Sequence, residues 1–382
     1  MFWHSGLQPE LIDWLKQEVF PAFEREHGVT IEELALGWGA PREEKLAVAF
    51  AAGVGPDIIV GSGNANHTIP LDAYFERWAE KASIVPAFLI PMRDVQGVLK
   101  AIPHEAEVRG FAYSKQIAFE SGLDADSPPA SWDELLAWAR QMTRIEGDQV
   151  TRSGFETVWG TPFVGSEFDW FLQQAGGSVA SPDMRESTIL SEAGLAAIEV
   201  MKELYEIGHP PHAASSINES MLASGGAAIA RGGPWVIDPW LEAHGSLDGL
   251  GVFAPRMSPE TRPVAITFVN GFAITDQAKN PDLAWKLIER LLSFDAQDAL
   301  AKYNFRLATR TDVGVQFGVP HIDLFAPWYR IAEFAAPPGF FPGRSDAARA
   351  LLEALRGERP PNDALRLMHV AQQVAIDHFW EQ

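Results

Sequence analysis

The chain has 382 residues, of which 47% are hydrophobic and 21% charged, and its 51 acidic and 30 basic side chains give a formal net charge of −21. This composition excludes wholesale disorder, and no apolar run reaches the roughly 20 residues that a membrane-spanning helix needs. So acidic a surface disfavours nucleic acid and anionic lipid as partners. The absence of cysteine excludes disulfides, thiolate nucleophiles and cysteine-ligated zinc, and it suits an oxidising compartment.

Strands and helices alternate along the first part of the chain. "MFWHSG" begins with a strand pattern, and "VTIEELALG" and "DIIVG" are typical of buried parallel strands. Between them, Pro41 predicts the start of a helix that stops at Gly53. Ser131 and Glu134 have the capping-box spacing and predict the start of another helix.

The same alternation continues toward the carboxyl end. "SEAGLAAIEVMKELYEIG" predicts a helix that ends at Gly208, and "AITFVNGFAIT" predicts another buried parallel strand. Asn280 and Pro281 then predict the cap and first turn of a helix. We expect an α/β fold with parallel-type sheets flanked by helices, in two lobes because one core would be too large. No single linker divides the chain, so it is expected to cross between the lobes more than once.

Signals for catalysis and for cofactors are weak. "GGPW" lacks the Lys-Ser/Thr of a phosphate loop, and Pro234 removes an amide donor. His209 and His212 are three residues apart, but the prolines between them favour a loop over a metal-binding helix. We therefore predict no enzyme activity, no catalytic residue, no cofactor and no metal site.

One motif points to a ligand. "ARGGPWVIDPW" places Trp235 and Trp240 on a backbone stiffened by two glycines and two prolines. Such a turn can present a flat aromatic face, and tryptophan offers the largest one at a small entropic cost. Tryptophans within amphipathic helices, such as Trp138 and Trp285, are expected to be core residues instead.

The order of the motifs resembles the extracellular solute-binding proteins of carbohydrate ABC importers, the maltose-binding-protein-like family. The resemblance covers nearly the whole chain and rests on these blocks in the family's order: "PAFEREHGV", "EEKLAVAFAAGVGPDIIVG", "GFAYSKQIAFESGL" followed by "PPASWDELLAWARQM", "GGAAIARGGPW" and "NGFAITDQAKNPDLAWKLIERLLS".

The resemblance implies a type II periplasmic-binding-protein fold, with two lobes joined by three crossings and a central ligand cleft. The amino-terminal lobe is expected to comprise residues 1–109 and 271–310. The carboxyl-terminal lobe is expected to comprise residues 110–270 and 311–382, with hinges near 110, 270 and 310.

The resemblance also implies that a sugar stacks on Trp235, while polar groups bond its hydroxyls. An aromatic face suits the C–H face of a pyranose, and carboxylate, amide and backbone groups suit its hydroxyl fringe. The other ligand-binding candidates by position are His4, Ser5, Trp38, Glu43, Asn64, Glu107, Phe168, Trp170, Asn270 and Gly271.

One stretch departs from the family pattern. Where relatives often carry an aromatic stacker, "FFPGRSDAARALLEALRG" has Arg344, and Phe341 or Phe340 is expected to substitute from the preceding loop. Alternatively, Arg344 bonds hydroxyls or pairs with an acidic ligand. This departure weakens an assignment to maltodextrin.

Three functions remain open at this stage. The first is a sugar or oligosaccharide receptor that delivers its ligand to the permease of an ABC importer. The second is the same fold binding another solute, such as a glycerol-phosphate-type ligand, through Arg344 or Arg109. The third is a sugar-cleaving enzyme, which would need two carboxylates at a separation of about 5–9 Å.

For the receptor, we expect a monomer with a carbohydrate ligand and the permease as partners, and no nucleic acid. It is expected to be periplasmic or extracellular, and associated with the membrane through the permease or a removed lipoprotein signal. In that interpretation, Met1 replaces an export segment.

Overall fold

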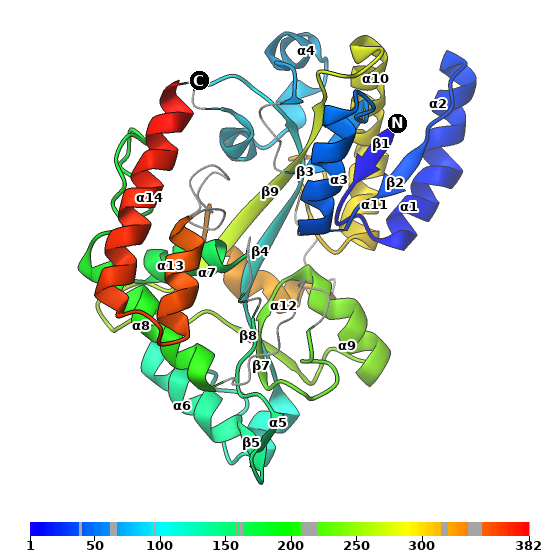
Figure 1. Ribbon diagram of the computed structural model, residues 1–382. Helices are drawn as coiled ribbons and strands as arrows, with labels where there is room; N and C mark the ends of the chain where they lie inside the picture. Colours follow the sequence, from blue (N-terminus) through cyan, green and yellow to red (C-terminus); the bar gives the residue numbers. More distant parts are fainter. Residues whose placement is uncertain are drawn as a thin grey trace. The chain divides into compact units, whose positions relative to one another are not determined.

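The computed structural model describes residues 1–37, 40–61, 67–94, 96–157, 159, 163–207, 220–314, 320–334 and 346–381, and its elements are shown in Figure 1. Contacts between Cα atoms divide the chain into two compact units. Unit 1 comprises Met1–Glu107 and Phe268–Ile322, and unit 2 comprises Val108–Thr267 and Asp323–Gln382. Each unit is therefore assembled from two separate stretches of chain.

Unit 1 is built on a mixed sheet. Its strands are β1 (Phe2–His4), β2 (Glu33–Ala35), β3 (Ile58–Gly61), β10 (Leu307–Ala308), the first part of β4 (Ile102–Ser114) and the last part of β9 (Ala265–Ile274). β1 pairs in parallel with β2 and β3, as predicted. β9, predicted as a parallel strand, runs antiparallel to β3 because it re-enters unit 1 from unit 2.

The helices of unit 1 follow from local sequence signals. They are α1 (Pro9–Trp14), the π-helical η1 (Leu15–Val19), α2 (Phe20–His27), α3 (Ala40–Ala51), α4 (Asp72–Arg77), the 3-10 segments η3 (Lys81–Ser83) and η4 (Pro86–Met92), α10 (Pro281–Leu291) and α11 (Phe294–Tyr303). The Oδ1 of Asn280 accepts a hydrogen bond from the amide of Leu283 at 3.0 Å, which caps α10 as predicted. Leu46 and Phe50 of α3 are both buried.

Unit 2 has β4 at the centre of its sheet. β4 continues here between β7 (Ile229–Gly232) and β8 (Leu250–Phe253), both antiparallel to it. The first part of β9 pairs in parallel with β11 (Ala332–Phe334), and β5 (Arg144–Glu146) forms a hairpin with β6 (Gln149–Arg152). β4 and β9 are thus strands that belong to both units.

Helices cover the sheet of unit 2. They are α5 (Lys115–Glu120), α6 (Trp132–Met142), α7 (Val164–Gln174), α8 (Glu192–Ile207), the 3-10 turn η6 (Pro234–Val236), α9 (Ile237–His244), α13 (Asp346–Leu355) and α14 (Pro361–Glu381), while α12 (Pro320–Tyr329) begins in unit 1 and ends in unit 2. α13 packs along α14 and against α8 (Figure 1). The core is aromatic: the ring of Phe111 lies 4.4 Å from that of Trp170 and 5.4 Å from that of Phe253, measured between centroids.

The cap predicted for α6 is present in a modified form. The Oγ of Ser131 accepts from the amide of Glu134 at 3.3 Å. The carboxylate of Glu134 accepts from the amide of Ala130 at 2.7 Å, one residue before the usual position. Among the described helices, none combines the length and the apolarity needed to cross a membrane.

Candidate functional site

The turn after β7 places Trp235 in unit 2. Gly232 ends the strand, and Pro234 and Trp235 enter a single 3-10 turn that leads into α9. A Cβ atom at Gly233 would lie 2.3 Å from the indole ring of Trp235, so any larger residue there would push the ring away. Glycine is therefore required because the ring lies directly over the backbone.

A cation lies against the ring. The guanidinium carbon of Arg109, on β4, is 5.0 Å from the centroid of the Trp235 ring, which is a cation–π distance. Arg109 and Trp235 are 9% and 7% exposed. Within the part of the chain that the structure describes, no hydrogen bond leaves the Trp235 Nε1, so this donor is left for water or a ligand. We call Arg109, Gly233 and Trp235 the Trp235 region.

Trp285, expected to be a core residue, has a different environment at a similar exposure of 6%. Its Nε1 donates to Glu289 at 2.7 Å, and its ring lies 5.3 Å from Tyr74 and 6.3 Å from Trp78. Exposure alone therefore does not separate the two tryptophans. The two tryptophans differ in their partners. The Nε1 of Trp285 donates to a protein carboxylate and its ring packs against aromatic rings, whereas the ring of Trp235 lies against the guanidinium of Arg109.

Phe168 and Trp170, predicted as ligand-contacting aromatics, lie in the core of unit 2. Both are fully buried on α7, and Trp170 donates from its Nε1 to the carbonyl of Val264 at 2.7 Å. As they are placed, neither side chain is open to a ligand, and both pack in the core. The sequence of α7 did not show that the rest of unit 2 would cover the side chains of Phe168 and Trp170.

A buried ion pair lies beside Trp170. Arg231 of β7 pairs with Glu167 of α7, and the two side chains are 3% and 0% exposed. The Arg231 guanidinium also lies 5.8 Å from the Trp170 ring centroid and donates to the Ser166 hydroxyl at 3.3 Å. This pair joins α7 to the strand that leads into Trp235.

In unit 1, polar groups meet at the carboxyl ends of the parallel strands β1 and β3. Arg42 of α3 donates from its Nε to the Ser5 hydroxyl at 3.0 Å and from its NH2 nitrogen to the carbonyl of Val60 at 3.1 Å. It also pairs with Glu43 at 2.8 Å. This edge of an open α/β sheet is where ligands commonly bind. Of these residues Ser5 and Glu43 were predicted, whereas Arg42 was missed although it lies next to Pro41 at the start of the helix.

His4 lies at the same edge and is held by a carboxylate. Its Nε2 is 2.7 Å from an oxygen of Glu33, and the other Glu33 oxygen is 2.7 Å from the amine of Lys16. Burial lowers the pKa of His4 below its ordinary value, although the hydrogen bond to Glu33 opposes this. The lowered pKa favours the neutral ring at physiological pH.

Glu107 and Asn270, both predicted to bind ligand, belong to a buried cluster in unit 1. We define the Glu105 cluster as Glu105, Glu107, Asn270, Asn304 and Arg306. Arg306 lies with its Nε 3.3 Å from Glu105 and 3.2 Å from Glu107. Glu105 also accepts from the amide nitrogens of Asn270 at 2.8 Å and Asn304 at 2.7 Å.

Burial shifts the pKa of Glu105 in this cluster and the pKa of the neighbouring His104. Desolvation raises the pKa of Glu105 to about 7, with the charge of Glu107 adding to the rise while Arg306 opposes it. Desolvation lowers the pKa of His104 to about 3, and Arg306 adds to that effect. His104 stacks on Phe272 with ring centroids 4.4 Å apart, and neither of its ring nitrogens has a hydrogen-bond partner.

Gly271 allows a close approach, but to protein atoms. A Cβ atom there would lie 2.7 Å from the sulfur of Met92, 2.8 Å from the Cβ of Ala101 and 2.9 Å from the carbonyl oxygen of Ile102. The space that the glycine leaves is therefore filled by unit 1 itself. The remaining predicted residues lie outside the described residues; these are Trp38, Asn64, Phe341 and Arg344, with the alternative Phe340.

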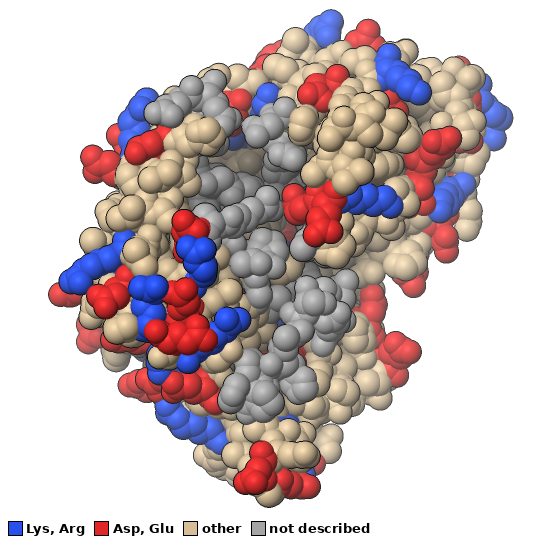
Figure 2. All heavy atoms as spheres, in the orientation of Figure 1, with Lys and Arg blue, Asp and Glu red and all other residues tan. Residues whose placement is uncertain are grey.

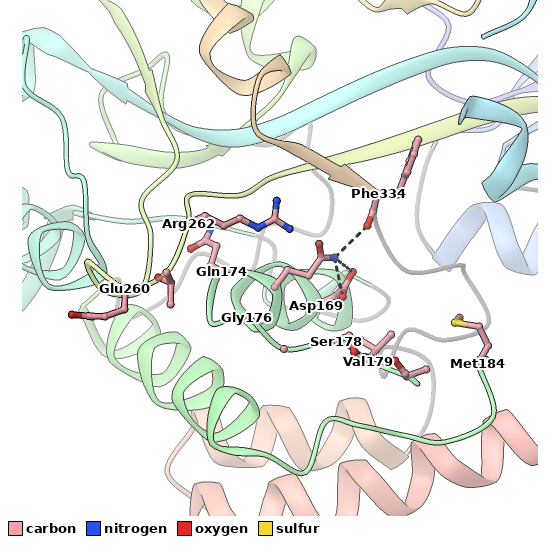
Figure 3. A pocket seen from close by; sticks show the side chains of 13 residues that line it. Asp169, Gln174, Gly176, Ser178, Val179, Met184, Glu260, Arg262 and Phe334 are labelled. Atoms are coloured by element: carbon pink, nitrogen blue, oxygen red, sulfur yellow. Dashed lines mark hydrogen bonds between the residues drawn. The ribbon is translucent and has the colours of Figure 1, made fainter. Parts of the chain in front are cut away.

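A separate pocket of about 580 Å³ lies within unit 2 (Figure 3). Asp169 and Gln173 of α7 line it, together with Glu260 and Arg262 from the segment before β9 and Phe334 at the end of β11. None of these residues was predicted as a ligand contact. The described residues contain no group of three or more histidine or acidic side chains placed to hold a metal ion.

The chain is similar to known binding proteins. The family model for bacterial extracellular solute-binding proteins matches residues 8–298. A binding protein of Brucella abortus is 23% identical over 291 residues, which cover 73% of this chain and 68% of that protein. The sn-glycerol-3-phosphate-binding periplasmic protein of Agrobacterium fabrum is 23% identical over 180 residues, which cover 41% of this chain and 38% of that protein.

A solved structure shows the same fold. The ABC transporter solute-binding protein from Thermotoga lettingae, bound with α-D-tagatose, superposes with a TM-score of 0.82 at 24% identity and covers 98% of both chains. This likeness confirms the fold class predicted from the sequence. The family match spans well over half of the chain and confirms the resemblance stated above. The chain therefore belongs to the bacterial extracellular solute-binding protein family.

Proposed function

We propose that this protein captures a sugar or oligosaccharide and delivers it to the permease of an ABC importer. The observation that carries the proposal is Trp235: its ring is placed by Gly233, and its indole N–H is left without a protein acceptor among the described residues. An indole face suits the C–H face of a pyranose, and the free N–H suits a hydroxyl. The tagatose-bound protein of the same fold adds support for a sugar.

Polar groups of unit 1 are proposed to complete the ligand contacts. Ser5, Arg42 and Glu43 offer a hydroxyl, a guanidinium and a carboxylate at the carboxyl ends of β1 and β3. These groups can donate to and accept from sugar hydroxyls. The other predicted ligand residues remain candidates, but the protein partners of Glu107 and Asn270 and the full burial of Trp170 and Phe168 make them weaker ones.

The predicted lobe ranges and hinges are part of the proposal. A ligand that contacts both units would draw them together, and few residues need change conformation because each crossing is a single segment, β4, β9 or α12. We expect the radius of gyration from small-angle scattering to fall with saturating ligand. An unchanged radius, with binding proven by calorimetry, would contradict closure.

A second candidate ligand is a glycerol-phosphate-type compound. It is favoured by the partial similarity to the sn-glycerol-3-phosphate-binding protein and by the position of Arg109, a cation, beside the proposed stacking ring. Guanidinium groups bind phosphate in a bidentate geometry. A glycerol phosphate has no extended apolar face to cover an indole, so the two ligand classes predict different effects of removing the ring.

We further propose that the protein performs no chemistry of its own, works as a monomer in the periplasm or outside the cell, and meets the membrane through its permease. Incubation with oligosaccharides should give a higher melting temperature and no cleavage product. Release of shorter sugars would favour the glycosidase alternative, in which two carboxylates act on the ligand.

The test of the binding proposal is a thermal-shift screen over monosaccharides, oligosaccharides and sn-glycerol 3-phosphate, followed by calorimetric titration. A ligand that binds only the folded state raises the melting temperature, with about 2.7 kcal/mol of added stability at 100 times its Kd. A response to sugars alone supports the main proposal, and a response to the phosphate alone supports the second candidate. No response to any member of either class would contradict both.

A further inference from the structure

A pocket of about 290 Å³ lies in unit 1, near the lower limit of about 300 Å³ for small-molecule sites. The starts of β1 and β3, the segment between α2 and β2, and the first turns of α10 surround it. The amides of Asp57 and Ile58 donate to the carbonyl of Met1 at 3.1 and 3.2 Å, which joins the starts of the two strands. Ser5 and Arg42 lie at the carboxyl ends of these strands, so the pocket is at the opposite edge of the sheet from the proposed sugar contacts.

Most of the pocket wall is apolar. Phe2, Phe23 and Ile58 line it and are buried, at 1%, 2% and 2% exposure. Val29 and Ile31, which lie just before β2, also line it and remain half-buried. Covering such partly open apolar surface with another apolar group is favourable, because it removes both surfaces from water. The pocket therefore suits an occupant with an apolar body.

The polar groups of the pocket gather around Asp57. One oxygen of its carboxylate accepts from the terminal amine of Met1 at 2.5 Å, and the other accepts from the amide of Lys279 at 2.9 Å. Although burial raises the pKa of Asp57, these hydrogen bonds and the two positive charges lower it below its ordinary value. The carboxylate is therefore ionised, and it forms a neutral ion pair with the amine of Met1.

Lys279 adds a positive charge to this polar end. It lines the pocket and its side chain is exposed. Within the ranges that the structure describes, no carboxylate forms an ion pair with its ammonium group. Because the pair of Met1 and Asp57 is neutral, Lys279 leaves this end of the pocket with a net positive charge, which complements a carboxylate.

The first turns of α10 extend the apolar wall away from Lys279. Leu283, Ala284 and Leu287 line the pocket along the helix. From Pro281 to Leu287 the helix rises about 9 Å, at about 1.5 Å per residue. An extended chain gains about 3.6 Å over three bonds, so the hydrocarbon part of an eight-carbon acid spans about 8 Å. The apolar wall therefore matches a chain of this length.

We propose that this pocket binds a medium-chain carboxylic acid, whose carboxylate pairs with the ammonium of Lys279 and whose hydrocarbon chain lies against Leu283 and Leu287. The site is separate from the proposed sugar site, because none of the groups proposed to bind sugar lines this pocket. It adds a ligand of a second chemical class to the protein.

The experiment uses the full chain and octanoate as the probe. Acidic side chains are spread over the face seen in Figure 2, and the net charge of −21 repels an anion, so the surface charge does not imitate a specific site. The design compares Lys279→Glu with Lys286→Glu, which make the same charge change at two exposed lysines of unit 1, only the first of which lines the pocket. Calorimetric titration at 0.15 M salt gives the Kd of each variant, and thermal melting checks that each is folded.

We expect saturable binding of one octanoate, a loss of at least tenfold in affinity for Lys279→Glu and a change of less than twofold for Lys286→Glu. Each buried CH₂ group is worth about fourfold in affinity, so hexanoate should bind the wild type at least fivefold more weakly than octanoate.

Equal losses in the two glutamate variants, equal affinities for hexanoate and octanoate, or no saturable binding to the wild type would overturn the proposal. Sugar affinity, measured on the same variants, should stay unchanged, so a failure of the acid site is distinct from a failure of the sugar site.

Discussion

The Glu105 cluster in unit 1 and the Trp235 region in unit 2 bury charged groups in different ways. In the cluster, two carboxylates share the guanidinium of Arg306, and two asparagine amides donate to Glu105. In the Trp235 region, the guanidinium of Arg109 faces an aromatic ring, and the indole donor has no protein acceptor among the described residues. The first arrangement is closed by the protein itself, whereas the second leaves a group that a solute can use. Satisfied polar groups suit a structural role, whereas for the placed donor of Trp235 we propose a binding role.

The largest expected effect comes from breaking the Glu105 cluster. Arg306→Met should cost about 3–5 kcal/mol of unfolding free energy, because it leaves two carboxylates buried without their cation. Urea-induced unfolding measures the loss. Arg290→Met is the control, since Arg290 pairs with Glu26 at 2.9 Å but both side chains are about half exposed, and such a pair contributes at most about 1 kcal/mol. Equal losses in the two variants would show that the cluster does not depend on its cation.

The second prediction concerns pH. Glu105 has a pKa of about 7 in the folded chain and 4.5 ordinarily, so between these values the folded protein keeps a proton that the unfolded chain releases. Glu105 therefore lowers stability as pH rises from about 4.5 to about 7. His104 acts in the opposite sense, because its pKa falls from 6.5 to about 3, so its contribution raises stability with pH between those values.

Glu105→Gln should remove the fall in stability that Glu105 causes as pH rises, and it should leave the rise in stability that His104 causes. The unfolding free energy of this variant should rise more steeply with pH between about 4.5 and 6.5 than that of the wild type. Urea unfolding at half-unit pH steps measures both slopes, with Glu358→Gln as an exposed control. Parallel pH profiles for the wild type and Glu105→Gln would contradict the raised pKa of Glu105.

The third prediction tests whether a sugar stacks on Trp235. Because Trp235 is only 7% exposed, most of the apolar area that stacking buries, about 50–80 Å², belongs to the sugar face. This burial is worth on the order of 1–2 kcal/mol, so Trp235→Ala should weaken sugar binding by roughly tenfold or more. Trp285→Ala, whose ring packs among aromatic neighbours, should instead cost about 3–5 kcal/mol of stability.

Calorimetric titration and melting of the unliganded variants separate these outcomes. Trp235→Ala should bind weakly and melt near the wild type, whereas Trp285→Ala should melt lower and bind normally while folded. If Trp235→Ala melts far lower and its folded fraction binds sugar as tightly as the wild type, Trp235 is a core residue and the stacking site is lost.

The sequence by itself determined the fold class and the elements whose signals lie in consecutive residues. Ser131 and Asn280 marked helix starts because a cap acts on an amide three residues away. The block order identified the family because each block combines a turn with the element beside it. In the same way, Gly233 and Pro234 pointed to Trp235, since they place its ring through local backbone geometry.

Only the tertiary structure decided which polar and aromatic side chains the protein uses for itself. Glu105 meets Asn304, which is 199 positions away in the chain, and Trp170 meets the carbonyl of Val264, 94 positions away. A carboxylate or an indole looks the same in sequence whether its partner is a distant residue or a solute. The direction of β9 was also decided at this level, because the strand returns from unit 2 and must pair with β3 in the opposite sense.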